Sequence, residues 1–342
     1  RDVYKRQIYN GSKRLNTIKQ EKLNNQAANL DVETSENSIQ ESIAQIYIQI
    51  LYAAESVKVN ENTLQVSIAQ RDRGQELLNA GSIAKSDLAQ LEAQVSTDRY
   101  QLVTAKATLQ DYKLQLKQLL ELDGENEMNV YLPALSDENV LLPLPTKKDV
   151  YMSALTLRPE IEASKLSVEA SELGIDIAKA GYLPTISLSA GIGTNHTSGS
   201  DFTFGEQVKN GWNNSIGVSV SVPIFNNRQT KSAVQKAKLQ RETSLLSLLD
   251  EQKTLYKTIE GLWLDANSAQ QRYAAANEKL KSTQISYDLI SEQFNLGMKN
   301  TVELLTEKNN LLQAQQEQLQ AKYMAILNTQ LLKFYQGDKL AL

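Results

Sequence analysis

The chain has 342 residues, a formal net charge of −4, no cysteine and one histidine, so disulfide bonds, thiolate metal sites and histidine metal clusters are excluded. Lysine and arginine are spread along the chain without a basic stripe, which argues against a nucleic-acid partner. No run approaches the ~20 apolar residues of a membrane-spanning helix. Because no nucleophile, metal set or phosphate loop is visible, we expect no catalytic residue, no metal, no cofactor and no enzyme.

Residues 1–7, RDVYKRQ, match neither an amphipathic strand nor a signal peptide. They carry three basic residues directly before a segment that reads like the middle of a longer protein. We interpret residues 1–7 as a non-native leader, and the alternative is an irregular N-terminal arm.

Residues 8–122 predict a first long helical hairpin. Apolar residues recur every three or four positions from Ile39 to Val57, and again every seventh position from Leu88 to Leu116. This spacing is typical of a coiled-coil seam on an otherwise polar helix. Gly81 lies between the two stretches, and glycine readily adopts the open backbone of a chain reversal. We expect Gly81 to mark the tip of an antiparallel hairpin; the alternative is a glycine tolerated inside a straight helix.

Residues 123–180 predict an irregular segment and a return helix. Three prolines interrupt the helical pattern in its first part, at Pro133, Pro143 and Pro145. The helical pattern then resumes up to residue 180.

Residues 181–226 predict a β-hairpin, because two stretches alternate with a period of two around a polar loop at 194–214. One face holds only serine and glycine, and aromatic residues such as Tyr182 and Trp212 flank the strands. These features are typical of membrane strands, although half-buried strands of soluble proteins also alternate. The expected lipid-facing residues are Ile186, Leu188, Ala190, Ile192, Ile216, Val218, Val220 and Val222.

Residues 227–336 predict a second long helical hairpin, and residues 337–342 form a C-terminal tail. The tip of this hairpin is expected at Gly297, which lies 216 positions after Gly81. The motif IYN at 8–10 and the motif IFN at 224–226 align at the same offset. We interpret the two hairpins as an internal tandem repeat.

These features, in this order, resemble the TolC-like outer-membrane efflux proteins. The resemblance rests on RPEI at 158–161, GYLPTISLSAG at 181–191, SVSVPIFNN at 219–227 and the two glycine tips. It implies a mainly α fold with a small membrane β part. Long antiparallel coiled-coil hairpins would form a trimeric α-barrel, joined to a β-barrel to which each protomer contributes strands. Residues 123–157 would form part of an equatorial belt.

The resemblance also implies a function and a set of partners. The protein would be an outer-membrane channel and exit duct of a tripartite efflux or secretion system, reaching from the outer membrane of a Gram-negative bacterium into the periplasm. Its partners would be two further copies in a homotrimer, a periplasmic adaptor (membrane fusion protein), an inner-membrane transporter and outer-membrane lipid. Family members give four strands per protomer, whereas we expect only the second hairpin here. The alternative is a soluble coiled-coil scaffold or interaction protein with a small β-module.

The resemblance places a gate at the hairpin tips. Carried over by position, Asp87 is the tip acid, Phe294 the aromatic, Lys299 the basic residue and Glu303 the acid that rings the periplasmic aperture. The best-known member has Tyr and Arg at the second and third positions, so this gate would lack one hydroxyl and one planar guanidinium. Alternatively, Asp87 and Glu303 cap the first turn of the returning helix, where negative charge is favoured.

Overall fold

The computed structural model describes residues 2–122, 128–133, 140–199 and 201–340, and it divides into two compact units. Residues 1–34 and 158–254 make up the first, which we call the strand unit. Residues 35–157 and 255–342 make up the second, which we call the hairpin unit. None of the described helices combines the length and hydropathy needed to cross a membrane.

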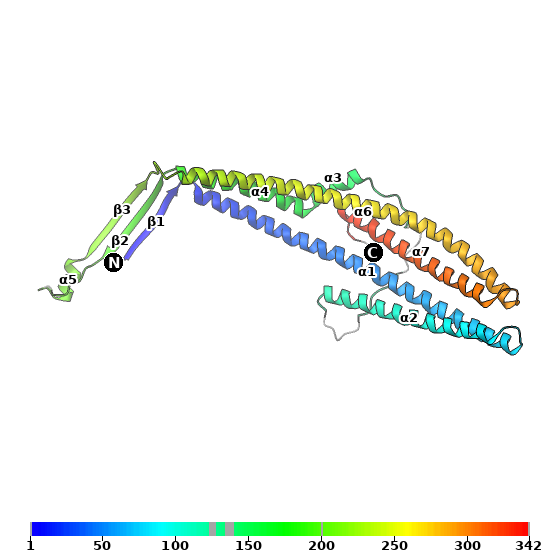
Figure 1. The fold of residues 1–342 in the computed structure, drawn as a ribbon. Coiled ribbons are helices and arrows are strands. Elements are labelled where there is room, and N and C mark those ends of the chain that lie inside the picture. The colour runs from blue at the N-terminus through cyan, green and yellow to red at the C-terminus, as the bar shows by residue number, and fades with distance from the viewer. Residues whose placement is uncertain (1, 123–127, 134–139, 200, 341–342) are drawn as a thin grey trace. The chain divides into compact units, whose positions relative to one another are not determined.

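The strand unit contains a three-stranded antiparallel sheet (Figure 1). Its strands are β1 (Asp2–Asn10), β2 (Thr185–Gly193) and β3 (Asn213–Ser221), in the order β1-β2-β3. The strands β2 and β3 lie inside the predicted hairpin at 181–226. The connection between them holds a short helix, α5 (Phe204–Asn210), where the sequence predicts only a polar loop. Thr203 and Glu206 form a capping box at its start, a local signal that the composition of the loop concealed.

The strand β1 corrects the sequence prediction. Its register runs from Asp2 opposite Ile192 to Asn10 opposite Thr185, with an irregularity after Gln7. The expectation that residues 1–7 form no strand, and that only two strands are present, is therefore wrong. The physical reason is that the free edge of β2 offers unpaired N–H and C=O groups, which an extended segment satisfies whatever its side chains are.

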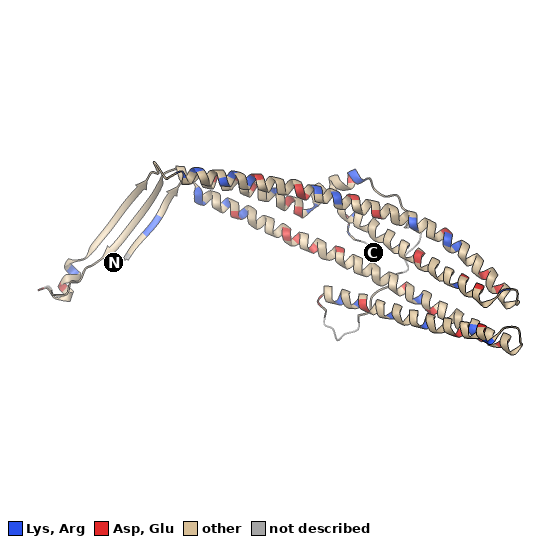
Figure 2. Ribbon diagram, viewed as in Figure 1, with Lys and Arg blue, Asp and Glu red and all other residues tan. Residues whose placement is uncertain are grey.

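The predicted lipid-facing residues share one face of β2 and β3. Ile186 lies opposite Val220, Leu188 opposite Val218 and Ala190 opposite Ile216. The face does not continue over β1, where Arg6 lies opposite Leu188. Figure 2 shows the same contrast, since β2 and β3 carry no charged residue and β1 does.

The helix α4 (Pro159–Lys179) completes the strand unit together with the 3-10 turn η2 (Ala180–Tyr182). Proline in the first turn suits a helix start, because its missing N–H would have no helical partner there. Gln20 Nε2 donates to the Ala170 carbonyl at 2.8 Å, and the Ser171 and Ser244 hydroxyls lie 2.8 Å apart. The helix α4 therefore contacts both α1 (Lys13–Asn79) and α6 (Gln229–Asn295) within this unit.

The hairpin unit is built from the part of α1 after residue 34 with α2 (Lys85–Leu119), and from the part of α6 after residue 254 with α7 (Thr301–Gln336). Within each pair, later residues of one helix contact earlier residues of the next, as antiparallel packing requires. Lys106 pairs with Glu61 at 2.8 Å, and Lys279 pairs with Glu317 at 2.7 Å. Figure 2 shows both signs of charge scattered along these helices.

The same offset of 216 positions relates the boundaries of the long helices. Both ends of α6 lie 216 positions after the corresponding ends of α1. Backbone φ angles are positive at Gly11 and Ser12, just before α1, and at Asn227 and Arg228, just before α6. The chain therefore leaves β1 and β3 through similar backbone turns.

One core cluster of the hairpin unit lies between helices of different hairpins. Ala44, Ile48 and Leu51 of α1 are buried against Tyr323, Leu327 and Leu331 of α7. The short helix α3 (Lys147–Leu157) also packs on α7. Of the predicted equatorial segment, residues 123–127 and 134–139 lie outside the described residues. The segment after them is held to α6, because Trp263 Nε1 donates to the Pro145 carbonyl at 3.0 Å.

Candidate functional site

The two predicted tips have the same backbone geometry. Gly81 and Gly297 both have a φ of 74°, in the left-handed region that favours glycine. The Gly81 N–H donates to the Leu78 carbonyl at 2.9 Å, and the Ser82 N–H donates to the Leu77 carbonyl at 2.8 Å. The second tip repeats this double hydrogen bond, which is the Schellman motif that ends a helix. Figure 1 shows both turns at the same end of the hairpin unit.

Both tip acids cap the helix that returns from the turn. The Ala84 N–H donates to Asp87 Oδ2 at 3.0 Å at the start of α2. At the start of α7, the Asn300 N–H donates to Glu303 Oε2 at 3.2 Å, and the Glu303 N–H donates to Asn300 Oδ1 at 2.9 Å. Each carboxylate satisfies an N–H that the helix leaves unpaired, so the geometry of the capping alternative is present at both tips.

The ion pair at the second tip is local. Lys299 Nζ donates to Glu303 Oε1 at 2.5 Å, one helical turn apart, and both side chains are partly exposed. The hydrogen bond from Lys299, and then that from the Asn300 N–H, lowers the pKa of Glu303. Within the described part of a single chain, Asp87 and Lys299 form no pair.

Phe294 lies in the helix interface rather than at the tip surface. Its side chain is 3% exposed and packs against Leu91 of α2 and Leu304 of α7. Tyr287 and Ile290 border this cluster. The side chain therefore ties α6 to both neighbouring helices.

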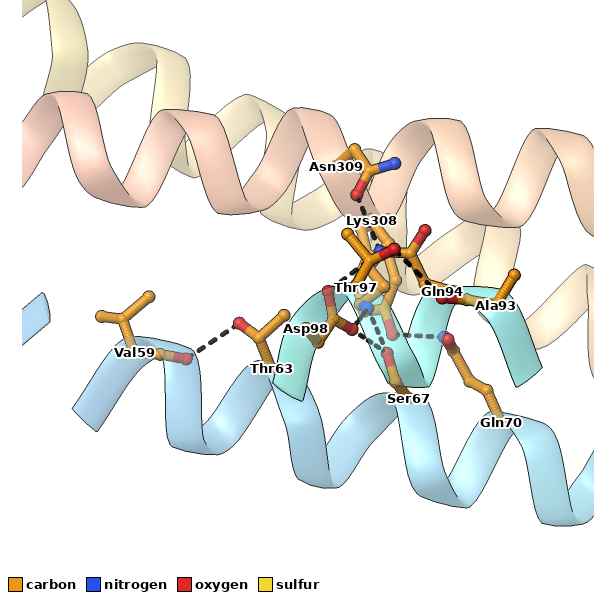
Figure 3. Close-up of polar contacts among 11 residues, drawn as sticks. Val59, Thr63, Ser67, Gln70, Ala93, Gln94, Thr97, Asp98, Lys308 and Asn309 are labelled. Carbon is orange, nitrogen blue, oxygen red and sulfur yellow. Dashed lines mark hydrogen bonds and ion pairs between the residues drawn. The ribbon is translucent and has the colours of Figure 1, made fainter. Parts of the chain in front are cut away.

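A buried polar network joins α1, α2 and α7 (Figure 3). It was not predicted from the sequence. Lys308 of α7 forms an ion pair with Asp98 of α2, and each of these two residues is hydrogen bonded to Ser67 of α1. The three residues are between 1% and 3% exposed. Gln94 Nε2 donates to Asp98 Oδ1 at 2.9 Å, which satisfies the second carboxylate oxygen.

A separate hydrogen bond of α1 reaches the fourth long helix. Gln70 Nε2 donates to the Tyr287 hydroxyl at 2.9 Å and so joins α1 to α6. Burial lowers the pKa of Lys308, and the hydrogen bond to Asp98 opposes that effect. The two opposite charges are buried together, whereas burying either charge without the other would carry a large free-energy cost.

One sequence signal could have identified Asp98. The seven-residue spacing that runs through Leu88 and Val95 defines a second seam position at Leu91, and the next such position is Asp98. A charge in a coiled-coil seam predicts a buried partner. The partner could not be named, because Lys308 lies 210 positions later and lysine is common on solvated helix faces.

Among the residues that the structure describes, no group of three or more histidine, cysteine, aspartate or glutamate residues could hold a metal ion.

Known proteins share both the sequence pattern and the fold. Residues 150–337 match the family described as outer membrane efflux protein. The chain is 25% identical to the outer membrane efflux protein BepC of Brucella suis over 294 residues, which is 85% of this chain and 61% of BepC. It is also 25% identical to the outer membrane protein TolC of Escherichia coli over 311 residues, which is 86% of this chain and 60% of TolC. The chain thus spans about 60% of the length of these relatives.

A solved structure matches over a larger share of both chains. The outer membrane protein VceC of Vibrio cholerae superimposes with a TM-score of 0.82 at 16% identity, over 99% of this chain and 79% of VceC. At this identity the similarity establishes the fold. With the fold and the sequence match in agreement, the chain belongs to the outer membrane efflux protein family.

Proposed function

We propose that this chain forms part of an outer-membrane exit duct, which passively conducts substrates from an inner-membrane transporter across the periplasm and outer membrane. The observation that carries the proposal is the combination of an uncharged, aliphatic-faced strand pair with two 67-residue helices in a family named for efflux. A 67-residue helix has a contour length on the order of 100 Å, which suits a protein that bridges two compartments.

The proposed assembly is a homotrimer in which each protomer adds strands to a shared β-barrel and two hairpins to an α-barrel. Two features support it. The strands β1 and β3 are edge strands, whose free backbone groups require partners in a lipid environment. The recurrence of helix boundaries at an offset of 216 positions supports a tandem duplication that supplies two similar hairpins per protomer. A periplasmic adaptor and an inner-membrane transporter would complete the tripartite system.

The proposed topology places the connection at 194–214 outside the cell and the glycine tips in the periplasm. The chain has no cysteine, so single labels can be introduced without interference. Ser198→Cys and Met298→Cys are suitable because both side chains are exposed, whereas a cysteine at Gly297 would strain the turn. In intact cells expressing the full-length protein, an impermeant thiol reagent should label Ser198→Cys alone. Met298→Cys should react only after the outer membrane is permeabilised, and equal labelling would overturn the topology.

The proposed gate lies at the tips, where Glu303 rings the aperture and Asp87 pairs with Lys299 of a neighbouring copy. Such a pair would compete with the Lys299–Glu303 pair found within one chain. An exposed ion pair contributes only about 0–1 kcal/mol, but a trimer would contain three such pairs. A modest free-energy difference is enough to shift the equilibrium between a closed and an open state. Phe294 would support this gate by packing behind it.

Neutralising the gate acid should raise single-channel conductance in a planar bilayer. Asp87→Asn removes the charge but keeps an oxygen that can accept the Ala84 N–H, so it separates gating from helix capping. We expect higher conductance from Asp87→Asn, and little further increase when Lys299→Met is added, because both remove the same pair. Glu303→Gln should instead weaken cation preference. Unchanged conductance in Asp87→Asn would leave Asp87 as a capping residue only.

A further inference from the structure

The buried ion pair distinguishes the two hairpins from each other. Applying the offset of 216 positions, the counterpart of Asp98 is Ala314, and the counterpart of Lys308 is Glu92. Ala314 is buried, whereas Glu92 is exposed. The two hairpins are otherwise similar in length and in tip geometry, yet only one arrangement of them brings Asp98 and Lys308 together.

Other pairings of the hairpins would be penalised. If a first hairpin faced another first hairpin in the same way, Glu92 would take the place of Lys308 and would oppose Asp98. If a second hairpin faced another second hairpin, Ala314 would replace Asp98 and leave the Lys308 ammonium without a counter-charge. Burying two like charges or one unpaired charge is costly, so both homotypic arrangements are disfavoured.

Slippage along the helices would be penalised as well. A shift of α7 by one helical turn moves Lys308 away from Asp98 and brings a leucine, Leu304 or Leu312, toward the carboxylate. The apolar contact of Leu91, Phe294 and Leu304 is non-directional and discriminates register less strongly. A polar residue in a coiled-coil seam is known to specify register and partner at a cost in stability.

We propose that Asp98, Lys308 and Ser67 are specificity-determining residues, which select the first hairpin as the partner of the second and fix their register. The Ser67 hydroxyl is hydrogen bonded to both charged groups, and so it fixes the position along α1 at which they meet. This role concerns how the helices pair, and it applies whether or not the assembled protein conducts substrates.

The test measures the register directly in the full-length protein in detergent. Spin labels are attached at Thr97→Cys on α2 and Asn310→Cys on α7, two exposed positions in a chain without native cysteine. Labelled chains are mixed with an excess of unlabelled chains, so that a trimer holds at most one labelled copy. Electron–electron distance measurements should then give a single narrow distribution for the otherwise unmodified chain. In the Asp98→Leu/Lys308→Leu chain, we expect a distribution at least twice as broad, or a second maximum displaced by up to about 5 Å, the rise of one helical turn.

The charge-swapped chain, Asp98→Lys/Lys308→Asp, is the matched control, and it should regain the narrow distribution because opposite charges again meet. An unchanged narrow distribution in the double-leucine chain would overturn the proposal. Loss of its helical circular dichroism would overturn the proposal too, because the pair would then act as a stabilising element. Failure of the swapped chain to narrow the distribution would likewise show that charge pairing does not set the register.

Discussion

Asp98→Ala is expected to lower the free energy of unfolding by about 3–5 kcal/mol, because it leaves the buried Lys308 ammonium without its counter-charge. The full-length protein would be unfolded with guanidinium in detergent and followed by circular dichroism. Asp98→Leu/Lys308→Leu is the control, and its stability should stay near that of the unmodified chain, since apolar replacement of a buried pair is often neutral or stabilising. A loss below about 1 kcal/mol in Asp98→Ala would contradict burial of the pair.

The pH dependence of this variant follows from the lowered pKa of Lys308. Removing Asp98 removes the interaction that opposes the effect of burial, so the folded-state pKa falls further below the unfolded value of about 10.4. Between these two pKa values the unfolded chain binds the extra proton, so the stability of the variant rises with pH. The destabilisation should therefore be largest below the folded-state pKa and should shrink as pH approaches about 10.4. If the stability loss of Asp98→Ala stayed constant between these two pKa values, the Lys308 side chain would not be a buried ammonium in the folded variant.

Phe294→Ala is expected to cost about 3–5 kcal/mol of unfolding free energy, because it opens a cavity among Leu91, Leu304 and the residues around them. Tyr100→Ala is the matched control, since that aromatic side chain of α2 is 75% exposed. Its removal should change stability by no more than about 0.5 kcal/mol. If Phe294→Ala left stability unchanged and altered only conductance, the side chain would line the aperture instead of packing behind it.

Local signals in the sequence predicted the elements that depend on local physics. The heptad spacing and the glycine at each tip identified the helices and their reversals, because coiled-coil seams and left-handed turns leave specific residue patterns. The alternation at Ile186 and Ile216 identified β2 and β3 for the same reason. The strand β1 was missed because its side chains do not alternate, and only the free edge of β2 accounts for its pairing.

The candidate site depended more on distant contacts. The family resemblance identified Asp87, Lys299 and Glu303 by their positions, but the hydrogen bonds that cap the helices at the tips are seen only in the structure. The ion pair of Asp98 and Lys308 joins residues from two hairpins, and no local pattern links them. Asp98 lies seven positions after Leu91, at a second seam position that the sequence analysis did not use, and this spacing does not identify the partner.

The mass of the detergent-extracted protein tests the proposal that the chain belongs to an outer-membrane duct built from three copies. Cells expressing the full-length protein would be fractionated, the outer membranes dissolved in mild detergent, and the protein mass determined by sedimentation equilibrium with the detergent density-matched. This method does not depend on whether the gate is open. We expect the protein to be recovered in the outer-membrane fraction with the mass of three chains. Recovery as a monomer that stays soluble without detergent would contradict it and would favour the coiled-coil scaffold.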